Sequence, residues 1–269
     1  MCSDTNHFHV ERLNQFIYTI QENISEIHPI YRNDPLNLYV ILGSEKAILV
    51  DTGCGLYPLR PIVERIIGQR DLIVVNTHAH WDHILGNHEF KEVYIHKNEA
   101  NIVSHGYSVF FLQNSPAKIV KRYEKYDHLI PPAEKVHPLE DGKTFELGGI
   151  KAEIIHSPGH SSGSICIQTD KKMLFTGDVA YYGDIFLPRR QEFPRVLKTL
   201  SKLINLWDKQ KIDKLYPSHR KTPCEPSLLI ELWKNIQKIG DVWDKRKYNE
   251  FFFAWEFQIN DFIFYVSRS

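Results

Sequence analysis

The stretch THAHWDHILGNH, residues 77–88, holds four histidines and an aspartate. Imidazole and carboxylate groups in this combination are ligands for zinc, manganese or iron. The lack of cysteine in the stretch argues against a closed structural zinc site, which usually uses thiolates. His78 and His80 alternate, so on an extended segment their side chains point to one side, whereas Asp82 and His83 follow where the chain turns away. These two groups could bind two adjacent metal ions.

Three later segments each bring one more residue of a ligand type into a loop after a strand-like run. They are SPGHSSGS with His160, LFTGDVAYYGD with Asp178 and LYPSHRKT with His219. A lone histidine is more often structural than a ligand, but four motifs in order favour an open catalytic metal site on loops held by a rigid scaffold. The histidines outside these motifs are expected to be structural or exposed: His88, His96, His105, His128, His137 and His156.

The elements that must position these residues can be read from hydrophobic periodicity. Two β-rich runs within residues 37–53 predict a hairpin that closes at Asp51. Apolar residues at helical intervals predict a helix over 59–67 that stops at Gly68, and the following run DLIVVNTHAH predicts a strand that leads into the histidines. The order of apolar run and then ligand recurs after residue 140, so the second half repeats the layout.

Two segments stand apart from this layout. Residues 101–135 are aromatic and basic without a strand pattern, which predicts a helical insertion or lid. Residues 250–267 read as two aromatic strands, which predict a closing hairpin on a sheet edge or over a pocket. The whole chain, 1–269, is expected to form a single domain with these two additions.

Composition sets the broad class. The chain has 269 residues, 42% of them hydrophobic, and its 33 basic residues balance 33 acidic ones. This balance gives no signal for a nucleic acid or an anionic membrane as partner. The beginning of the chain lacks a secretory pattern, no run is long and apolar enough for a membrane span, and the cysteines are widely separated, so reduced thiols and a cytoplasmic location are expected. The cysteines are Cys2, Cys54, Cys166 and Cys224.

At this point the sequence resembles the metallo-β-lactamase superfamily, over roughly residues 15–225. The family signature His-x-His-x-Asp-His stands at residues 78–83, and the later motifs match the family's remaining ligand positions. The resemblance implies an α/β fold, a four-layer αββα sandwich of two mixed β-sheets flanked by helices. It also implies two divalent metal ions, zinc in the first place, with manganese or iron as alternatives. Carried over by position, one metal would be held by His78, His80 and His160, a second by Asp82, His83 and His219, with Asp178 bridging and Asp51 orienting ligands.

The resemblance is strongest to the branch that holds glyoxalase II-like enzymes, acyl-coenzyme A thioesterases and acyl-homoserine lactonases. It implies a hydroxide between the metals that attacks the carbonyl carbon of a thioester, ester or lactone in a small acyl substrate. Asp82 or Asp178 could accept a proton. Tyr181, in GDVAYYGD, matches a tyrosine that some members present to the substrate carbonyl, and its alternative is a structural tyrosine at a loop corner.

Departures from other branches narrow the expectation. Position 178 is an aspartate, whereas some true β-lactamases have a thiol there. Position 80 is a histidine, whereas the diiron flavoproteins have a glutamate there. About fifty residues follow His219, whereas glyoxalase II carries a helical domain there, and the aromatic tail favours an apolar acyl group. The alternatives left open are β-lactam hydrolysis, a phosphodiesterase or nuclease, and a non-catalytic metal-binding module. A homodimer is compatible with the sequence.

Overall fold

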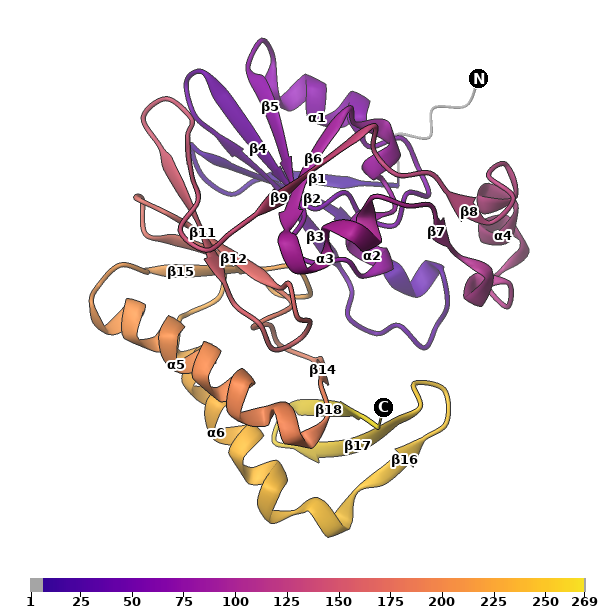
Figure 1. Ribbon diagram of the computed structural model, residues 1–269, viewed down its shortest axis with the longest axis vertical. Helices are drawn as coiled ribbons and strands as arrows, with labels where there is room; N and C mark the ends of the chain where they lie inside the picture. Colours follow the sequence, from indigo (N-terminus) through magenta and orange to yellow (C-terminus); the bar gives the residue numbers. More distant parts are fainter. Residues whose placement is uncertain (1–6, 269) are drawn as a thin grey trace.

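The protein, seen as a computed structural model that describes residues 7–268, has two β-sheets packed face to face with helices outside them (Figure 1). The strands of the first sheet, in spatial order, are β1 (His9–Arg12), β2 (Ile17–Glu22), β3 (Leu36–Leu42), β4 (Lys46–Val50), β5 (Asp71–Val75), β6 (Glu92–His96) and β9 (Lys135–Leu139). β1 to β4 pair antiparallel, and β4, β5, β6 and β9 pair parallel. The β3–β4 pair is the hairpin predicted within residues 37–53, and β5 ends just before the histidine motif.

The helices of the first half make the crossovers that parallel strands require. α1 (Arg60–Ile67) connects β4 to β5, begins with Pro61 in its first turn and ends at Gly68, which has a φ of 62°. This confirms the predicted helix. The other helical segments before residue 130 are η2 (Ile24–Glu26), α2 (Trp81–Ile84), η3 (Asn87–Glu89), α3 (Lys97–Val103), η4 (Phe110–Leu112) and α4 (Ala117–Glu124).

The second sheet contains five strands. In spatial order they are β10 (Thr144–Glu146), β11 (Lys151–His156), β12 (Ile165–Thr169), β13 (Met173–Gly177) and β15 (Lys214–Pro217). Neighbours pair antiparallel except β13 and β15, which are parallel, so both of these strands end at the same edge. The long helices α5 (Phe193–Asp208) and α6 (Ser227–Asp241) cover the outer face of this sheet, at the lower left of Figure 1.

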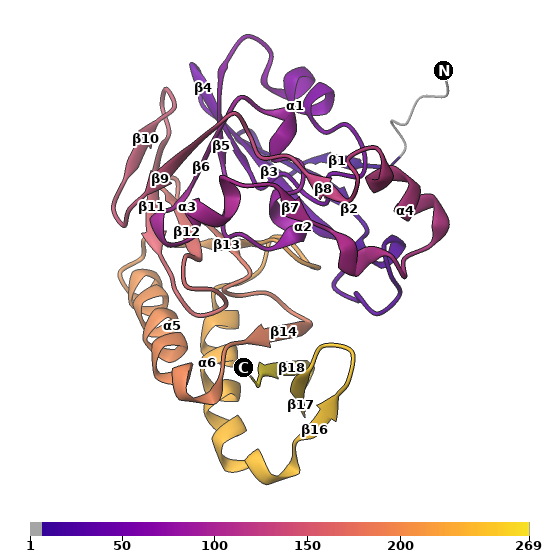
Figure 2. The same cartoon turned by 45° about the vertical axis from the view of Figure 1, so that its right-hand side comes forward.

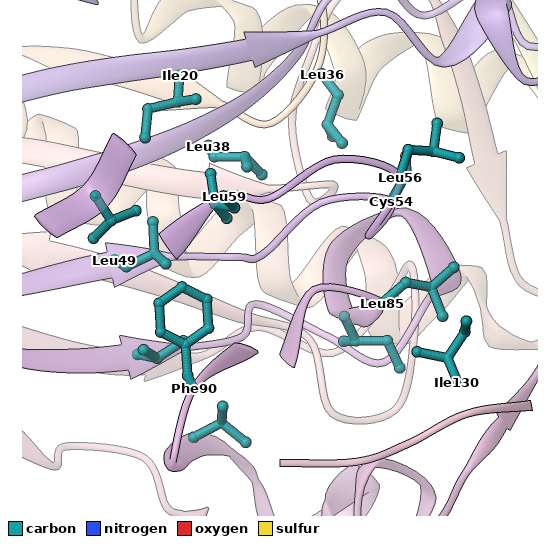
Figure 3. Packing of buried hydrophobic residues seen from close by; sticks show 14 of the residues in the cluster. Ile20, Leu36, Leu38, Leu49, Cys54, Leu56, Leu59, Leu85, Phe90 and Ile130 are labelled. Carbon is teal, nitrogen blue, oxygen red and sulfur yellow. The ribbon is translucent and has the colours of Figure 1, made fainter. Parts of the chain in front are cut away.

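Alternation of buried side chains along the strands separates the core into layers. On β3, Tyr39 and Ile41 point between the two sheets, where they pack with Ile154 and Phe175 of the second sheet. Leu36, Leu38 and Val40 point the other way, into the layer beneath α1 that Figure 3 shows together with Leu59 and Phe90. A third cluster joins the second sheet to α5 and α6. The expected αββα sandwich is therefore confirmed.

A separate four-stranded sheet extends this sandwich below the second sheet, beside α6 (Figure 2). Its strands, in spatial order, are β14 (Asp184–Leu187), β18 (Phe262–Ser267), β17 (Ala254–Ile259) and β16 (Lys247–Asn249). β17 and β18 form an antiparallel hairpin, and β18 pairs parallel with β14. In the sequence, the short helix η5 (Arg190–Glu192) follows β14, and the short helix η6 (Trp243–Lys245) precedes β16. The aromatic tail thus joins a strand from the middle of the chain.

The segment 101–135 lies against the first sheet's outer core. It contains the two-stranded ribbon of β7 (Tyr107–Ser108) and β8 (Leu129–Ile130), with η4 and α4 between them. Ile119 and Tyr123 of α4 are buried in that core, and the Tyr123 hydroxyl donates to the Cys54 carbonyl at 2.9 Å. Within residues 7–268, no helix has the length and apolarity to cross a membrane.

Candidate metal centre

Two sheet edges bring the predicted ligands to one place. His78 and His80 follow β5, where His80 is still extended (φ −77°, ψ 152°), and α2 begins at the next residue and carries Asp82 and His83. His160 lies in the loop between β11 and β12, Asp178 directly follows β13, and His219 follows β15. Because β13 and β15 are parallel neighbours, their two ligands emerge at one edge. The structure therefore brings all seven residues together.

The first set of ligands is three histidines. The Nδ1 atom of His80 lies 3.0 Å from Nε2 of His78 and 2.8 Å from Nε2 of His160. All three ligand atoms lie within 4.8 Å of one another, and the three rings meet edge to face. Three nitrogens that converge in this way fit one side of a tetrahedral metal site.

The second set is Asp82, His83 and His219, whose ligand atoms also lie within 4.8 Å of one another. Asp82 Oδ2 is 3.6 Å from Nε2 of His83 and 3.5 Å from Nε2 of His219. Asp178 lies between the two sets, with Oδ1 3.5 Å from Nε2 of His83 and Oδ2 3.7 Å from Nε2 of His160. Both sets are positioned for metal binding, and the assignment of each ligand to one metal stays a prediction.

Two atoms at the centre test whether a metal fits. Nε2 of His83 and Oδ1 of Asp178 are buried, and neither has a hydrogen-bond partner among the described residues. A buried polar atom without a partner costs about 1–3 kcal/mol, and a metal ion would remove that cost by accepting both lone pairs. Nitrogen and carboxylate oxygen donors without thiolates suit zinc, manganese and iron. The residues therefore fit a divalent metal.

The electrostatics differ between the two sets. Burial, together with His83, His80 and His160, holds the pKa of His78 well below its ordinary value, so this ligand is neutral. For His83, burial opposes protonation, but Asp82, Asp178 and Asp51 outweigh it and raise the pKa well above the ordinary value. The acidic side chains around His83 therefore favour positive charge at the second set, and a metal cation would supply such charge.

Hydrogen bonds on the far side of each ring fix the ligand histidines. Nδ1 of His83 donates to Oδ2 of Asp51 at 2.9 Å, and Asp51 also accepts from the amide and the hydroxyl of Thr77. This is the orienting contact expected of Asp51. Nδ1 of His160 donates to the Phe186 carbonyl, and Nδ1 of His219 to the Asn33 carbonyl, each at 3.1 Å. In both rings Nε2 is left to face the centre.

Glu99 is a buried residue of this site that the sequence motifs do not reveal. Its Oε2 accepts from the amide of Ala79 at 2.7 Å, and its Oε1 accepts from the amide of Gly163 at 2.8 Å. The first amide lies between His78 and His80, and the second lies in the loop of His160. Both partners are backbone groups, so no side-chain pattern in the sequence marks the contact. α3 thereby connects the two loops of the three-histidine set.

Tyr181 lies beside the centre, with its ring 5.2 Å from that of His219. It is completely buried, and its hydroxyl donates to the Asp184 carbonyl at 2.6 Å. Burial and the nearby Asp178 raise the pKa of Tyr181 well above its ordinary value, so the hydroxyl stays neutral. The hydrogen bond is the kind a structural tyrosine makes, and contact with a substrate stays a prediction.

The centre opens into a cavity of about 660 Å³. Residues of both ligand sets, among them His80, Asp82 and His219, line part of it. Its walls are mostly aromatic and come from distant parts of the chain: Tyr31, Trp81, Phe111, Phe186, Phe251, Phe252 and Phe253. Polar ligands at the base of an apolar cavity are typical of a small-molecule site.

The remaining histidines make contacts elsewhere. His88 accepts from the Tyr126 hydroxyl and its Nδ1 contacts the Leu85 carbonyl, and His137 contacts Glu92 at 2.9 Å. His96 and His156 stack at 3.8 Å between ring centroids. None of these belongs to the three groups of possible metal ligands found among residues 7–268.

Comparison with known proteins agrees with this geometry. A family model described as the metallo-β-lactamase superfamily matches residues 32–219. The human acyl-coenzyme A thioesterase MBLAC2 is 30% identical over 227 residues, which cover 77% of this chain and 78% of the relative. A metallo-β-lactamase family protein of Thermus thermophilus has a TM-score of 0.62 at 21% identity, over 86% of this chain and 82% of that one. A metallo-β-lactamase from Pontibacter korlensis has a TM-score of 0.59 at 18% identity, over 86% and 99%. The sequence match and the shared fold lead to one conclusion: the chain belongs to the metallo-β-lactamase superfamily.

Proposed function

We propose that this protein is a dinuclear metal-dependent hydrolase of acyl thioesters, with activity toward related esters and lactones. The observation that carries the proposal is the aromatic cavity of about 660 Å³ that the ligand residues help to line. An apolar wall beside a metal centre suits an acyl chain whose carbonyl must reach the ligands. The similarity to acyl-coenzyme A thioesterases over most of the chain supports the thioester as the bond.

We propose two metal ions, zinc in the first place, held as the resemblance implies. His78, His80 and His160 would hold one, Asp82, His83 and His219 the other, and Asp178 would bridge them. Two such ions would lower the pKa of a water molecule and stabilise negative charge on the carbonyl oxygen.

The chain's own residues would bind the acyl group and handle the proton. Phe251, Phe252 and Trp81 would exclude water from the acyl chain. In the hydrolysis, the oxygen of water bonds to the carbonyl carbon, the carbon–sulfur bond breaks, and the thiolate leaves with the bonding electron pair. Asp82 or Asp178 would accept the proton from water and return it to the thiolate. Tyr181 would assist the oxyanion if its hydroxyl turned from the Asp184 carbonyl.

The test combines metal content with a substrate panel. Protein purified without a chelator is analysed by mass spectrometry and then offered acyl-coenzyme A thioesters, acyl-homoserine lactones, a chromogenic β-lactam and a phosphodiester. We expect about two metal ions per chain and the fastest turnover on a thioester. A preference for the β-lactam or the phosphodiester would keep the metal centre and overturn the substrate class. Metal-loaded protein that is inert on every substrate would overturn the proposal.

The variant Asp178→Ala tests whether metal binding and hydrolysis depend on the same residue. Because this carboxylate touches both ligand sets, metal content and thioester hydrolysis should fall together, with turnover reduced about a thousandfold. Asp208→Ala, an exposed carboxylate at the end of α5, is the control and should leave both values unchanged. Full metal content with full activity in Asp178→Ala would contradict its bridging position.

A further inference from the structure

The aromatic cavity does not end at the metal centre. A second hollow of about 520 Å³ adjoins it, and both are lined by His80, His160, Phe186 and Phe252. Its walls differ, because they include the serines 161 and 162 and the arginines 189 and 195. A substrate with its reacting carbonyl at His80 and His160 could therefore place an apolar group in the aromatic cavity and a polar group in the second hollow.

The second hollow continues into a third of about 600 Å³, with which it shares Arg189 and Ser267. The third hollow is lined by Arg190, Arg268, Trp243 and Trp255, and among residues 7–268 no aspartate or glutamate lines it. The wall comes from η5, η6, β17 and the end of β18, four elements that the small sheet brings together.

Arginines and aromatic rings alternate along this wall. The guanidinium of Arg190 lies 4.7 Å from the ring centroid of Trp243, and that of Arg246 lies 5.5 Å from Trp243 and 4.7 Å from Trp255. The guanidinium of Arg268 lies 5.0 Å from the ring of Trp255. The rings hold these cations in place and remain themselves partly exposed.

Among the residues that the structure describes, few acidic groups pair with the arginines of this wall. Among residues 7–268, Arg190 and Arg268 form no ion pair, whereas Arg189 and Arg195 share Glu192. Within the same range, the one ion pair of Arg246 is with the fully exposed Asp244, at 3.9 Å. Its guanidinium also donates to the Trp243 carbonyl at 3.0 Å, and its buried Nε has no hydrogen-bond partner. Guanidinium groups in this state suit phosphate, and a partly exposed indole suits the face of a base.

We propose that this arginine and tryptophan wall binds the phosphorylated adenosine end of a coenzyme A thioester. The inference rests on the proposed thioester hydrolysis. The acyl chain would lie in the aromatic cavity and the thioester at the ligand residues. The pantetheine arm would cross the second hollow, and the phosphates and adenine would meet Arg190, Arg268 and the two indoles. The wall thus selects the leaving group, while the aromatic cavity selects the acyl group.

The test compares two thioesters with the same acyl group. One is the coenzyme A ester, and the other is the N-acetylcysteamine ester, which lacks the nucleotide. The variant is Arg190→Gln with Arg268→Gln, and either single substitution serves if the double variant does not fold. Arg65→Gln, on an exposed face of α1, is the matched control. The wild type should hydrolyse the coenzyme A ester with a higher kcat/KM than the N-acetylcysteamine ester. In the variant the ratio of the two kcat/KM values should fall about tenfold, because KM for the coenzyme A ester rises. The control should keep the wild-type ratio.

A direct binding measurement separates this inference from the proposed function. Adenosine 3′,5′-bisphosphate, titrated by calorimetry, should bind the wild type and the control, and bind the arginine variant about tenfold more weakly. If neither thioester is hydrolysed, the proposed function fails, and bisphosphate binding still reports on the wall. If both esters are hydrolysed equally well by wild type and variant, only the wall's assignment fails. Tighter binding of a single-stranded oligonucleotide than of the bisphosphate would also overturn it.

Discussion

Asp178 and Tyr181, three residues apart, show how one loop serves both the ligands and their surroundings. The carboxylate of Asp178 reaches both sets of imidazoles, while the hydroxyl of Tyr181 turns to the backbone of Asp184. Burial opposes the charge of Asp178, but His219 and His83 hold its pKa well below the ordinary value, so it is ionised. Tyr181 stays a neutral donor. The two residues therefore have separable roles.

Replacement of Tyr181 by phenylalanine tests that separation. The variant should keep the wild-type metal content because no predicted ligand changes, and kcat should fall about tenfold if the hydroxyl assists the oxyanion. The loss of its hydrogen bond should also lower the free energy of unfolding by about 1 kcal/mol. Turnover, metal content and thermal unfolding are measured on one preparation. Unchanged turnover with reduced stability would assign Tyr181 a structural role only.

At the scale of elements, the short helix α3 fixes the positions of two ligand loops relative to each other. Glu99 in its first turn accepts from the amides of Ala79 and Gly163. Gly163 is needed for this approach, since a Cβ there would lie 2.8 Å from Cδ of Glu99. His96, at the N-cap of the same helix, accepts from the amide of Asn98. The helix therefore depends on two side-chain acceptors, Glu99 and His96.

Glu99→Ala should weaken metal binding, because it frees the amides that hold the loops of His80 and His160. Changes in groups that orient metal ligands typically cost about 10- to 100-fold in affinity or activity. Glu99→Gln keeps one carbonyl acceptor and should recover part of this loss. Metal affinity is measured by competition with a chelator. Equal affinity in wild type, Gln and Ala variants would show that Glu99 does not position the ligands.

His96 predicts a loss of stability in mild acid. Burial, and then the stacked His156, lower the pKa of His96 to about 4, below its unfolded value of about 6.5. The unfolded chain therefore binds the proton more readily, and the stabilising contribution, complete above about pH 6.5, is lost as the pH falls toward 4. Protonation of Nδ1 would also remove the acceptor for Asn98 and place a positive charge at a helix N-terminus.

The measurement is the melting temperature between pH 7 and pH 4 for the wild type and His96→Asn, which keeps a capping acceptor that does not titrate in this range. As the pH falls, the melting temperature of the variant should rise relative to that of the wild type. An effect of metal loss that is common to both proteins cancels in this difference. His105→Asn, at the other end of α3, is the control and should follow the wild type. A constant difference would exclude His96 as the titrating group.

At the scale of the whole molecule, the metal centre joins the two halves of the chain. Residues 78–83 come from the first sheet, and the loops that carry His160, Asp178 and His219 come from the second. The two sheets also share an apolar core between them. The metal is therefore expected to add to an interface that already exists, so the fold should survive its removal.

Chelation should lower the melting temperature by roughly 5 °C or more without unfolding the protein at room temperature, because metal ions that bind only the folded state stabilise it by mass action. Scanning calorimetry with a chelator, followed by reloading with zinc, checks this result and its reversal. Asp178→Ala should show a smaller shift. An unchanged melting temperature in the wild type would contradict metal binding at this interface.

Much of this arrangement could be predicted from the sequence because its signals are local. A few neighbouring residues are enough to predict each of three features: the hairpin within residues 37–53, the helix at 60–67 and the ligands that follow strand-like runs. The pairing of β14 with β18 is different, because it joins residues 184–187 to residues 263–266. Neither segment carries a sequence signal that identifies the other as its partner. The role of Glu99 could not be predicted from the sequence for a similar reason, because its hydrogen-bond partners are backbone amides.

That parallel pair has a consequence for synthesis on the ribosome. When His219 has been added, every predicted ligand exists, but β18 does not, and β14 still lacks its neighbour. Phe251 to Phe253, which wall the aromatic cavity, also come later than all the ligands. The nascent chain thus has all its predicted ligands before it has the phenylalanines that close the cavity.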